Sequence, residues 1–256
     1  MQTQRLTIGG AGIEYRFAGS DAAGRDIVML HEGLGSTSMW RDFPERLAQA
    51  TRARVLAYSR RGYGGSAALN TPRSLDYMHE EARVHLPVLL SALGIQRPIL
   101  FGHSDGASIA LIQAAEPGST ARAVVALAPH VKVEALTVRS IEQTRAAFES
   151  TDLRARLARH HVDVDGTFWG WNRIWLDPRF RTWNIEGLLP RIRCPVLAMQ
   201  GTEDEYGTLE QIDSIERAVP GAQALPLSDS RHSPHRDQPD RVLAATRRFL
   251  DERIPA

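Results

Sequence analysis

Short apolar runs alternate along the chain with longer segments of helical period, and this alternation limits the possible folds more than any other feature of the sequence. The apolar runs cover Arg5 to Ile8, Ile13 to Phe17, Asp26 to Leu30, Arg54 to Tyr58, Pro98 to Phe101, Ala123 to Leu127, Pro195 to Gln200 and Ala222 to Leu227. Several of them lack polar alternation, which is typical of strands buried on both faces. The pattern predicts an α/β fold, with an N-terminal hairpin followed by a mostly parallel, doubly wound sheet.

Helical period is clearest between Leu75 and Leu93, where apolar residues recur every three or four positions. Pro87 lies inside this segment and has no amide donor, so we expect it to kink or split the helix. Further helices are predicted over Ser38 to Gln49, Asp105 to Glu116, Thr208 to Ala218 and Pro239 to Glu252.

The composition excludes several classes of protein. Hydrophobic residues make up 43% of the chain and charged residues 24%, as in ordinary globular domains, and a net charge of +1 gives no reason to expect nucleic acid or membrane as partner. No run approaches the roughly 18 apolar residues of a membrane span, and the N-terminus lacks a signal-peptide core, so we expect a cytoplasmic protein. Cys194 is the only cysteine, which excludes an intramolecular disulfide, and we interpret it as a small buried residue.

The most specific motif is Gly102-His103-Ser104-Asp105-Gly106, which follows a predicted strand and opens a predicted helix. A serine on so tight a turn is held in a strained conformation that projects its hydroxyl, and the flanking glycines let strand and helix approach. The amide of Asp105 then lies at a helix N-terminus, where developing negative charge is favoured. We therefore predict Ser104 as a nucleophile; the alternative is a glycine-rich turn with a serine cap.

A serine nucleophile requires a base, and the base requires a residue that fixes its tautomer. The chain has nine histidines. The loop after the run Pro195 to Gln200 offers three carboxylates, on Glu203, Asp204 and Glu205.

These motifs resemble the α/β-hydrolase family, and the resemblance extends over nearly the whole chain. The family order of Ser, acid and His leaves His232 and His235 as the histidines to choose from. Gly201 to Asp204 is similar to the family's G-x-x-D, and His232 to Pro239 is similar to its H-x-P-H-x-[DE]-x-P. The resemblance implies Asp204 as the acid and His232 as the base. Glu203 stays open as a substitute acid, while His235 and His103 are interpreted as packing or hydrogen-bonding residues, with His103 also a candidate substrate contact.

The family's oxyanion loop resembles His31 to Ser36, although Glu32 stands where the family usually has glycine. We assign the oxyanion donors to the amides of Gly33 and Asp105, with Leu34 as the alternative in the first loop. Glu32 is interpreted as a structural carboxylate bonded to backbone amides, and whether it reaches the pocket is left open. Arg60 to Ser66 resembles the family's R-G-x-G-x-S turn, a structural feature.

The stretch from about Ala135 to Pro190 shows helical segments, clustered aromatics and no convincing strand. We interpret residues 135–190 as a helical cap inserted into a core domain formed by residues 1–134 and 191–256. If the segment is helical, Phe168, Trp171 and Trp175 share one face. Most such rings would anchor the cap, and one or two would line a substrate pocket.

The segment from His160 to Asp165 holds four side chains of metal-ligand type, but without a partner motif a surface turn is favoured, and we expect no metal or cofactor. The resemblance implies a serine hydrolase acting on a small-molecule carboxylic ester or related acyl substrate through an acyl-enzyme. Two alternatives stay open, a hydrolase of C-C bonds in ring-cleavage products and a ligand sensor without turnover. Ser104 stands where dehalogenases and epoxide hydrolases have aspartate, which disfavours both. The acyl group and the oligomeric state are not determined by the sequence.

Overall fold

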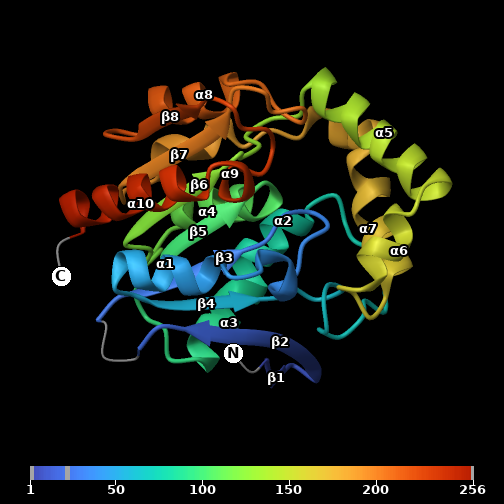
Figure 1. Cartoon of the computed structure of the whole chain (residues 1–256), viewed down its shortest axis with the longest axis horizontal. Coiled ribbons are helices and arrows are strands. Elements are labelled where there is room, and N and C mark those ends of the chain that lie inside the picture. Colours follow the sequence, from blue (N-terminus) through green and yellow to red (C-terminus); the bar gives the residue numbers. More distant parts are fainter. Residues whose placement is uncertain (1–2, 21–23, 255–256) are drawn as a thin grey trace.

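The computed structural model describes residues 3–20 and 24–254, and its eight strands form one sheet in the order β1-β2-β4-β3-β5-β6-β7-β8 (Figure 1). The pairs β1–β2 and β2–β4 are antiparallel, and every other pair is parallel. The strands are β1 (Gln4–Ile8), β2 (Ala11–Ala18), β3 (Asp26–Leu30), β4 (Arg54–Tyr58), β5 (Ile99–His103), β6 (Ala123–Leu127), β7 (Val196–Gly201) and β8 (Gln223–Leu227). The predicted α/β class with a mostly parallel sheet is confirmed.

The central strands are buried on both faces, as their continuous apolar runs predict. Along β3, Ile27 and Met29 pack into the core on one face of the sheet, while Val28 and Leu30 pack into the core on the other. Because side chains alternate along a strand, both faces must be covered for all four residues to leave water. Strands β3, β4 and β6 have the bounds that their apolar runs predict.

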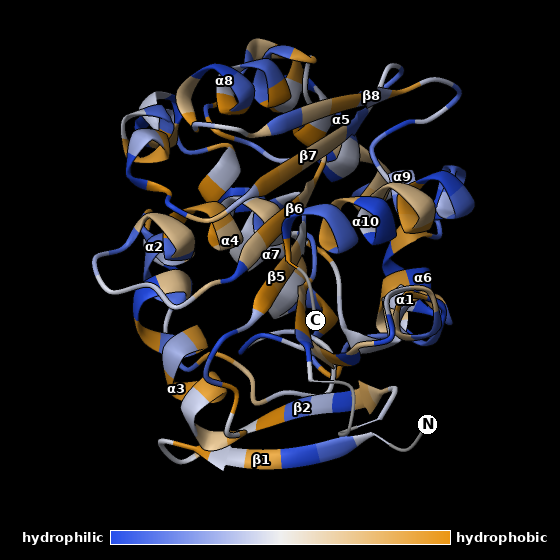
Figure 2. Ribbon diagram, turned by 90° about the vertical axis from the view of Figure 1, so that its left-hand side faces the viewer, coloured by the Kyte–Doolittle hydropathy of each residue, from blue (hydrophilic) through white to orange (hydrophobic). Residues whose placement is uncertain are grey.

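Helices cover both faces of the sheet (Figure 2). One face carries α1 (Phe43–Thr51) and α10 (Pro239–Arg253), whose buried side chains join the core of Ile27 and Met29. The opposite face carries α2 (Tyr77–Glu80), α3 (Leu86–Ala92), α4 (Asp105–Ala115) and α8 (Glu210–Ala218). The doubly wound arrangement follows directly from strands that are apolar on both sides.

Two predicted helices differ in detail from the structure. The prediction of one helix over Ser38 to Gln49 is wrong, because the chain forms a 3-10 turn η2 (Thr37–Trp40) and then α1, separated at Arg41, whose φ of 55° lies in the left-handed region. The helix around Pro87 is interrupted as expected, by a π turn η3 (Glu81–His85) between α2 and α3. The wider turn relieves the clash of the proline ring with the preceding turn of helix.

Between β6 and β7 the chain forms helices and, apart from an isolated bridge between Lys132 and Asn184, no β-structure. The helices are α5 (Ala135–Ser150), α6 (Leu153–Ala158), α7 (Val164–Trp175), η4 (Pro178–Thr182) and η5 (Glu186–Arg191). Of these, α5, α6 and α7 lie at one end of the sheet in Figure 1. The division into a core domain and a cap over residues 135–190 stays a prediction, and we refer to these residues as the cap segment. A short helix α9 (Pro234–Asp237) precedes α10. In the described part of the chain, no helix is long and apolar enough to cross a membrane.

Candidate active site

The parallel strands end at one edge of the sheet, and the three residues predicted as a catalytic set follow three of them. Ser104 follows β5, Asp204 follows β7, and His232 lies beyond β8. Because the carboxyl ends of parallel strands share an edge, residues far apart in sequence meet there. The structure therefore brings together Ser104 and His232 across 128 positions of sequence.

Ser104 occupies a turn that only a closely packed strand and helix can hold. Its φ of 53° and ψ of −120° lie outside the broadly allowed regions, and its amide donates to the carbonyl of Leu127 at 2.9 Å. A Cβ on Gly102 would lie 2.3 Å from the carbonyl oxygen of Gly106, and a Cβ on Gly106 would lie 2.0 Å from that of Leu30. The two glycines are thus required by backbone contacts, and the strained turn presents the hydroxyl at the sheet edge.

The Ser104 hydroxyl begins a continuous chain of hydrogen bonds. Its Oγ lies 3.0 Å from His232 Nε2, and His232 Nδ1 lies 2.8 Å and 3.0 Å from the two carboxylate oxygens of Asp204. A carboxylate at Nδ1 fixes the tautomer in which Nε2 is free to accept a proton. The arrangement has the geometry of a nucleophile, a general base and an orienting acid.

Further contacts hold Asp204 and His232 in place. Asp204 accepts hydrogen bonds from the amide of Tyr206 at 2.8 Å and from Gln200 Nε2 at 3.1 Å. His103 Nε2 donates to the carbonyl of His232 at 2.7 Å. The neighbouring Glu203 is exposed, and it is Asp204 that the structure places against the imidazole.

The proton affinities of the pair fit this arrangement. Burial lowers the pKa of His232, but the charge of Asp204 and the hydrogen bond to it outweigh burial, so the pKa lies above the usual value of 6.5. Burial raises the pKa of Asp204, but the charge and hydrogen bond of His232 hold it below its usual value. Both shifts indicate a carboxylate that stabilises a protonated imidazole.

The predicted oxyanion donors lie around Ser104. The amide of Asp105 opens α4, and within the described residues no backbone acceptor is paired with it. Gly33 and Leu34 line the same cavity as Ser104, and their amides likewise have no acceptor in the described part of the chain. Unpaired donors at this edge suit the negative oxygen of a tetrahedral intermediate. The choice between Gly33 and Leu34 stays open.

The side chain of Asp105 forms a different set of contacts, which connect the Ser104 turn to the cap segment. Its carboxylate accepts a hydrogen bond from Tyr77 Oη at 2.5 Å, and Trp175 Nε1 donates to the same Tyr77 oxygen at 3.1 Å. Burial raises the pKa of Asp105. A hydrogen-bonded bridge therefore runs from α7 to the residue that follows Ser104, a link that local sequence patterns did not reveal.

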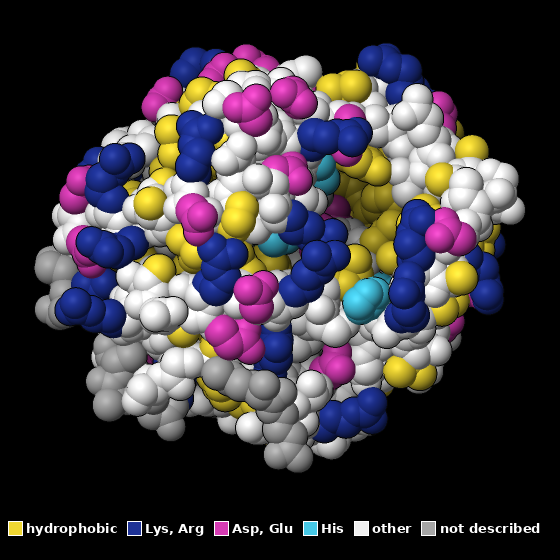
Figure 3. Space-filling model, in the orientation of Figure 1, with side chains coloured by type: hydrophobic (Ala, Val, Ile, Leu, Met, Phe, Trp, Pro, Cys, Tyr) yellow, Lys and Arg dark blue, Asp and Glu magenta, His cyan; other side chains and the backbone are white. Residues whose placement is uncertain are grey.

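A cavity of about 190 Å³ opens at Ser104. Figure 3 shows a hollow with hydrophobic and histidine side chains beside the α5–α7 side of the molecule. The cavity is lined by Glu32, Gly33, Leu34, His103, Ser104, Asp105, His130, Ile141, Trp171, Trp175, Glu205, Tyr206, His232 and Ser233. The structure thus places two predicted rings, Trp171 and Trp175, and also His103 at the candidate site.

Phe168 is not among these lining residues, so the structure gives no support to its prediction as a substrate contact. It is fully buried, and its ring stacks on Phe148 with 3.6 Å between ring centroids. The three aromatic residues do share the helix α7, as their spacing predicts. Phe168 lies where α7 packs on α5. Residues on one helix can therefore contact different elements, and here only Trp171 and Trp175 reach the cavity.

Glu32 reaches the cavity, and the interpretation that it bonds backbone amides is wrong. Its carboxylate lies 3.4 Å from His103 Nδ1 and 3.8 Å from Arg236. Burial raises the pKa of Glu32, but the hydrogen bond and charge of His103 hold it well below its usual value. His235 is a packing residue, as interpreted, with its ring 4.8 Å from that of Trp40.

His130, which the sequence analysis did not single out, also lines the cavity. Its side chain is buried, and burial followed by the charge of His232 lowers its pKa to about 3, so the imidazole is neutral at physiological pH. Its Nδ1 has no hydrogen-bond partner within the described residues. Ser108 holds its backbone, donating to the His130 carbonyl at 2.6 Å. In the sequence, the one feature that could have indicated His130 as a site residue is its position shortly after the apolar run that forms β6.

The segment from His160 to Asp165 forms no metal cluster. His161 Nδ1 accepts from the amide of Gly64 at 2.9 Å and Nε2 donates to the carbonyl of Leu34 at 2.9 Å, so both nitrogens bind backbone. Among the residues described, no group of three potential ligands could hold a metal ion. Cys194 is partly buried, and burial raises the pKa of its thiol to about 11.

Comparison with known proteins identifies the scaffold. Residues 27–245 match the model of a family described as the alpha/beta hydrolase family. Relatives include the sn-1-specific diacylglycerol lipase ABHD11 of Mus musculus, 27% identical over 93% of this chain and 85% of that protein. The serine hydrolase BPHL of Homo sapiens is 27% identical over 90% of this chain and 80% of its own length. The enol-lactonase of Burkholderia xenovorans, 21% identical, has a TM-score of 0.77 over 97% of this chain and 100% of that chain, a likeness of fold alone.

Proposed function

The chain belongs to the alpha/beta hydrolase family, and on this premise we propose that it is a serine hydrolase that cleaves a carboxylic ester or related small acyl substrate through an acyl-enzyme on Ser104. The observation that carries the proposal is the unbroken hydrogen-bonded chain from Ser104 through His232 to Asp204. Such a chain activates a hydroxyl that would otherwise be a weak nucleophile.

In the proposed reaction, Ser104 Oγ attacks the carbonyl carbon while His232 Nε2 takes its proton. The carbonyl oxygen becomes an oxyanion, which the amides of Asp105 and of Gly33 or Leu34 stabilise. His232 then gives its proton to the leaving alcohol as the carbon–oxygen bond breaks. Water attacks the acyl-enzyme with His232 again as the base, and Ser104 recovers its proton as the acid leaves.

The cavity lining supports a neutral substrate of modest size. Glu32 and Glu205 contribute carboxylates, and none of the described lining residues is a lysine or an arginine, so an anionic acyl group would be repelled. Trp171 and Trp175 supply apolar surface from α7. His130 presents a neutral imidazole, which suits a hydroxyl or carbonyl group on the substrate. No cofactor takes part in the proposed reaction.

The proposal is tested by labelling with a fluorophosphonate probe and by rates on p-nitrophenyl esters of increasing acyl length. We expect the label on the peptide that contains Ser104 and the highest kcat/KM with short acyl chains, because the cavity measures only about 190 Å³. Labelling elsewhere would contradict the proposal. Faster cleavage of a dienol ring-cleavage product than of any ester would favour a C-C hydrolase instead, and a sensor would show only slow turnover.

The acid limb of the pH profile is expected to lie above pH 6.5. His232 must be neutral to act as a base, and its pKa is raised overall, since Asp204 outweighs the opposing effect of burial. Activity should therefore fall as the pH decreases through this raised pKa. The measurement is kcat/KM for a non-ionisable ester between pH 5 and 9, with circular dichroism as a control for folding. A midpoint below about 6 would contradict the shift, since it would place the pKa under the ordinary value of ~6.5.

Substitution of Gly33 by alanine is expected to lower kcat/KM about 100-fold, because displacement of catalytic groups by about 1 Å has effects of this size. A Cβ at Gly33 would lie 2.0 Å from Trp171 Nε1, so the oxyanion loop or α7 must move. The measurement is ester hydrolysis by Gly33→Ala and by the double variant Gly33→Ala/Trp171→Ala.

The double variant should recover much of the loss, since the clashing indole is gone. Gly187→Ala is a matched control, because a Cβ at Gly187 meets nothing within 4 Å. The explanation by steric contact fails if the double variant is no more active than Gly33→Ala alone.

A further inference from the structure

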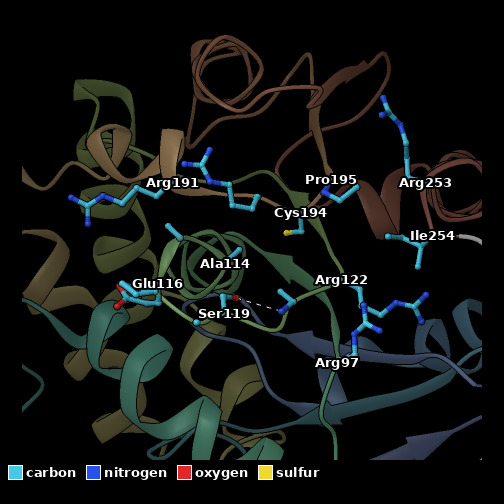
Figure 4. Close-up of a pocket in the computed structure, with 15 residues that line it drawn as sticks. Arg97, Ala114, Glu116, Ser119, Arg122, Arg191, Cys194, Pro195, Arg253 and Ile254 are labelled. Carbon is cyan, nitrogen blue, oxygen red and sulfur yellow. Dashed lines mark hydrogen bonds between the residues drawn. The ribbon is translucent and has the colours of Figure 1, made fainter.

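A second, larger hollow lies at the opposite edge of the sheet, where β5, β6 and β7 begin (Figure 4). Its volume is about 780 Å³, compared with about 190 Å³ for the cavity at Ser104, and the two share no lining residue. Hollows of this size commonly accommodate small molecules. A ligand bound here would be separate from the reacting groups.

The lining of this hollow is strongly basic. It includes the five arginines Arg97, Arg122, Arg191, Arg193 and Arg253. Among the described residues of the lining, the only carboxylate belongs to Glu116, which already pairs with Arg83 at 2.8 Å. The described lining thus carries an excess of positive charge, although the net charge of the whole chain is only +1. Such an excess attracts anions.

The arginines come from separate parts of the chain. Arg97 and Arg122 precede β5 and β6, Arg191 and Arg193 precede β7, and Arg253 ends α10. Figure 4 shows Arg97 and Arg122 next to each other on one side of the hollow and Arg191 on the other side, with Ala114 and Cys194 between them. A ligand that uses both sides must carry anionic groups at separated positions.

Three of these arginines have no carboxylate partner among the residues that the structure describes. Within residues 3–20 and 24–254, no carboxylate forms an ion pair with Arg97, Arg191 or Arg193. Arg122 is partly buried, and burial together with the charges of Arg97 and Arg25 lowers its pKa. Repulsion of this kind is relieved when an anion binds between the guanidinium groups.

We propose that this hollow, which we call the arginine hollow, binds a small molecule that carries two or more phosphate groups. The planar guanidinium group matches phosphate oxygens in a bidentate manner, and one phosphate would occupy only one side of the hollow. None of the described residues that line it is aromatic, and the lining includes the small residues Ala114, Ala115 and Cys194. Recognition therefore rests on the phosphates, and a nucleotide base would add little.

Calorimetric titration of the full chain at fixed ionic strength tests the proposal. Tripolyphosphate should bind at least about tenfold more tightly than orthophosphate, since it reaches arginines on both sides. ADP and GDP should bind with equal affinity, and raising the salt concentration should weaken binding. Equal affinity for orthophosphate and tripolyphosphate would overturn the proposal, and so would tighter binding of a single-stranded RNA than of tripolyphosphate at equal phosphate concentration.

The arginines are tested with the triple variant Arg97→Gln/Arg191→Gln/Arg193→Gln, whose three positions are exposed. We expect tripolyphosphate affinity to fall at least about tenfold, because each lost guanidinium removes charge-assisted hydrogen bonds. Hydrolytic activity at Ser104 and the melting temperature should not change.

A matched control, Arg139→Gln/Arg181→Gln/Arg248→Gln, removes the same charge from exposed positions outside the hollow and should retain full tripolyphosphate affinity. Equal weakening in both triple variants would show that only the net charge matters, and would overturn the proposed site.

Discussion

Ser104→Ala is expected to lower kcat for ester hydrolysis by on the order of 10⁵- to 10⁶-fold, because the residues of a Ser-His-Asp set act as a unit. The alanine removes the only protein atom that bonds to the acyl carbon in the proposed mechanism. The hydroxyl lies 3.0 Å from His232 Nε2, so its loss also removes the proton that this base would take. The measurement is steady-state hydrolysis of the best p-nitrophenyl ester, together with loss of fluorophosphonate labelling.

Two controls separate the loss of chemistry from the loss of structure. The backbone at residue 104 has a φ of 53°, which alanine tolerates no better and no worse than serine, so the free energy of unfolding should change by no more than about 1 kcal/mol. The double variant Ser104→Ala/His232→Ala should be no less active than Ser104→Ala alone. A protein that senses ligands without turnover would instead show little change in its low activity, and that result would refute the proposed reaction.

The fold could be predicted closely in segments where burial on both faces requires apolar residues at nearly every position. Strands such as β3 and β6 are apolar at every position or nearly so, because helices cover both faces, and their bounds followed from the apolar runs alone. The break between η2 and α1 could not be predicted in this way. Arg41 adopts a left-handed conformation there, and its side-chain type gives no sign of it, whereas a glycine would have.

The candidate site could be predicted where short motifs mark the ends of strands. Ser104, Asp204 and His232 each lie in a loop at the carboxyl edge of a parallel sheet, so their meeting follows from topology once the strands are assigned. Their catalytic roles stay a prediction until activity is measured.

Contacts between distant elements were beyond the reach of sequence patterns. Tyr77 links Trp175 to Asp105 through two hydrogen bonds that join α2, α7 and the start of α4. Neither helical periodicity nor a short motif predicts which polar side chains of one helix form hydrogen bonds with another helix. The same reason explains why Phe168 was grouped with Trp171 although it packs on Phe148.

Asp204→Asn is expected to lower kcat by on the order of 10³- to 10⁴-fold, although the shape of the side chain is almost unchanged. The carboxylate now accepts from His232 Nδ1 at 2.8 Å, which leaves Nε2 free to act as the base toward Ser104. An amide group at this position would donate to Nδ1 and so favour the opposite tautomer, in which Nε2 carries the proton and cannot take another. The measurement is kcat on the plateau of the pH profile.

The same variant should move the acid limb of that profile to lower pH. The charge of Asp204 is what raises the pKa of His232 against the opposing effect of burial, so burial would prevail once the charge is removed. Glu203→Gln is the matched control, because Glu203 is the exposed neighbour that sequence alone left open as the acid, and it should keep kcat within about twofold. A larger loss in Glu203→Gln than in Asp204→Asn would transfer the role of the acid to Glu203, since only the residue that holds the imidazole can set both its tautomer and its pKa.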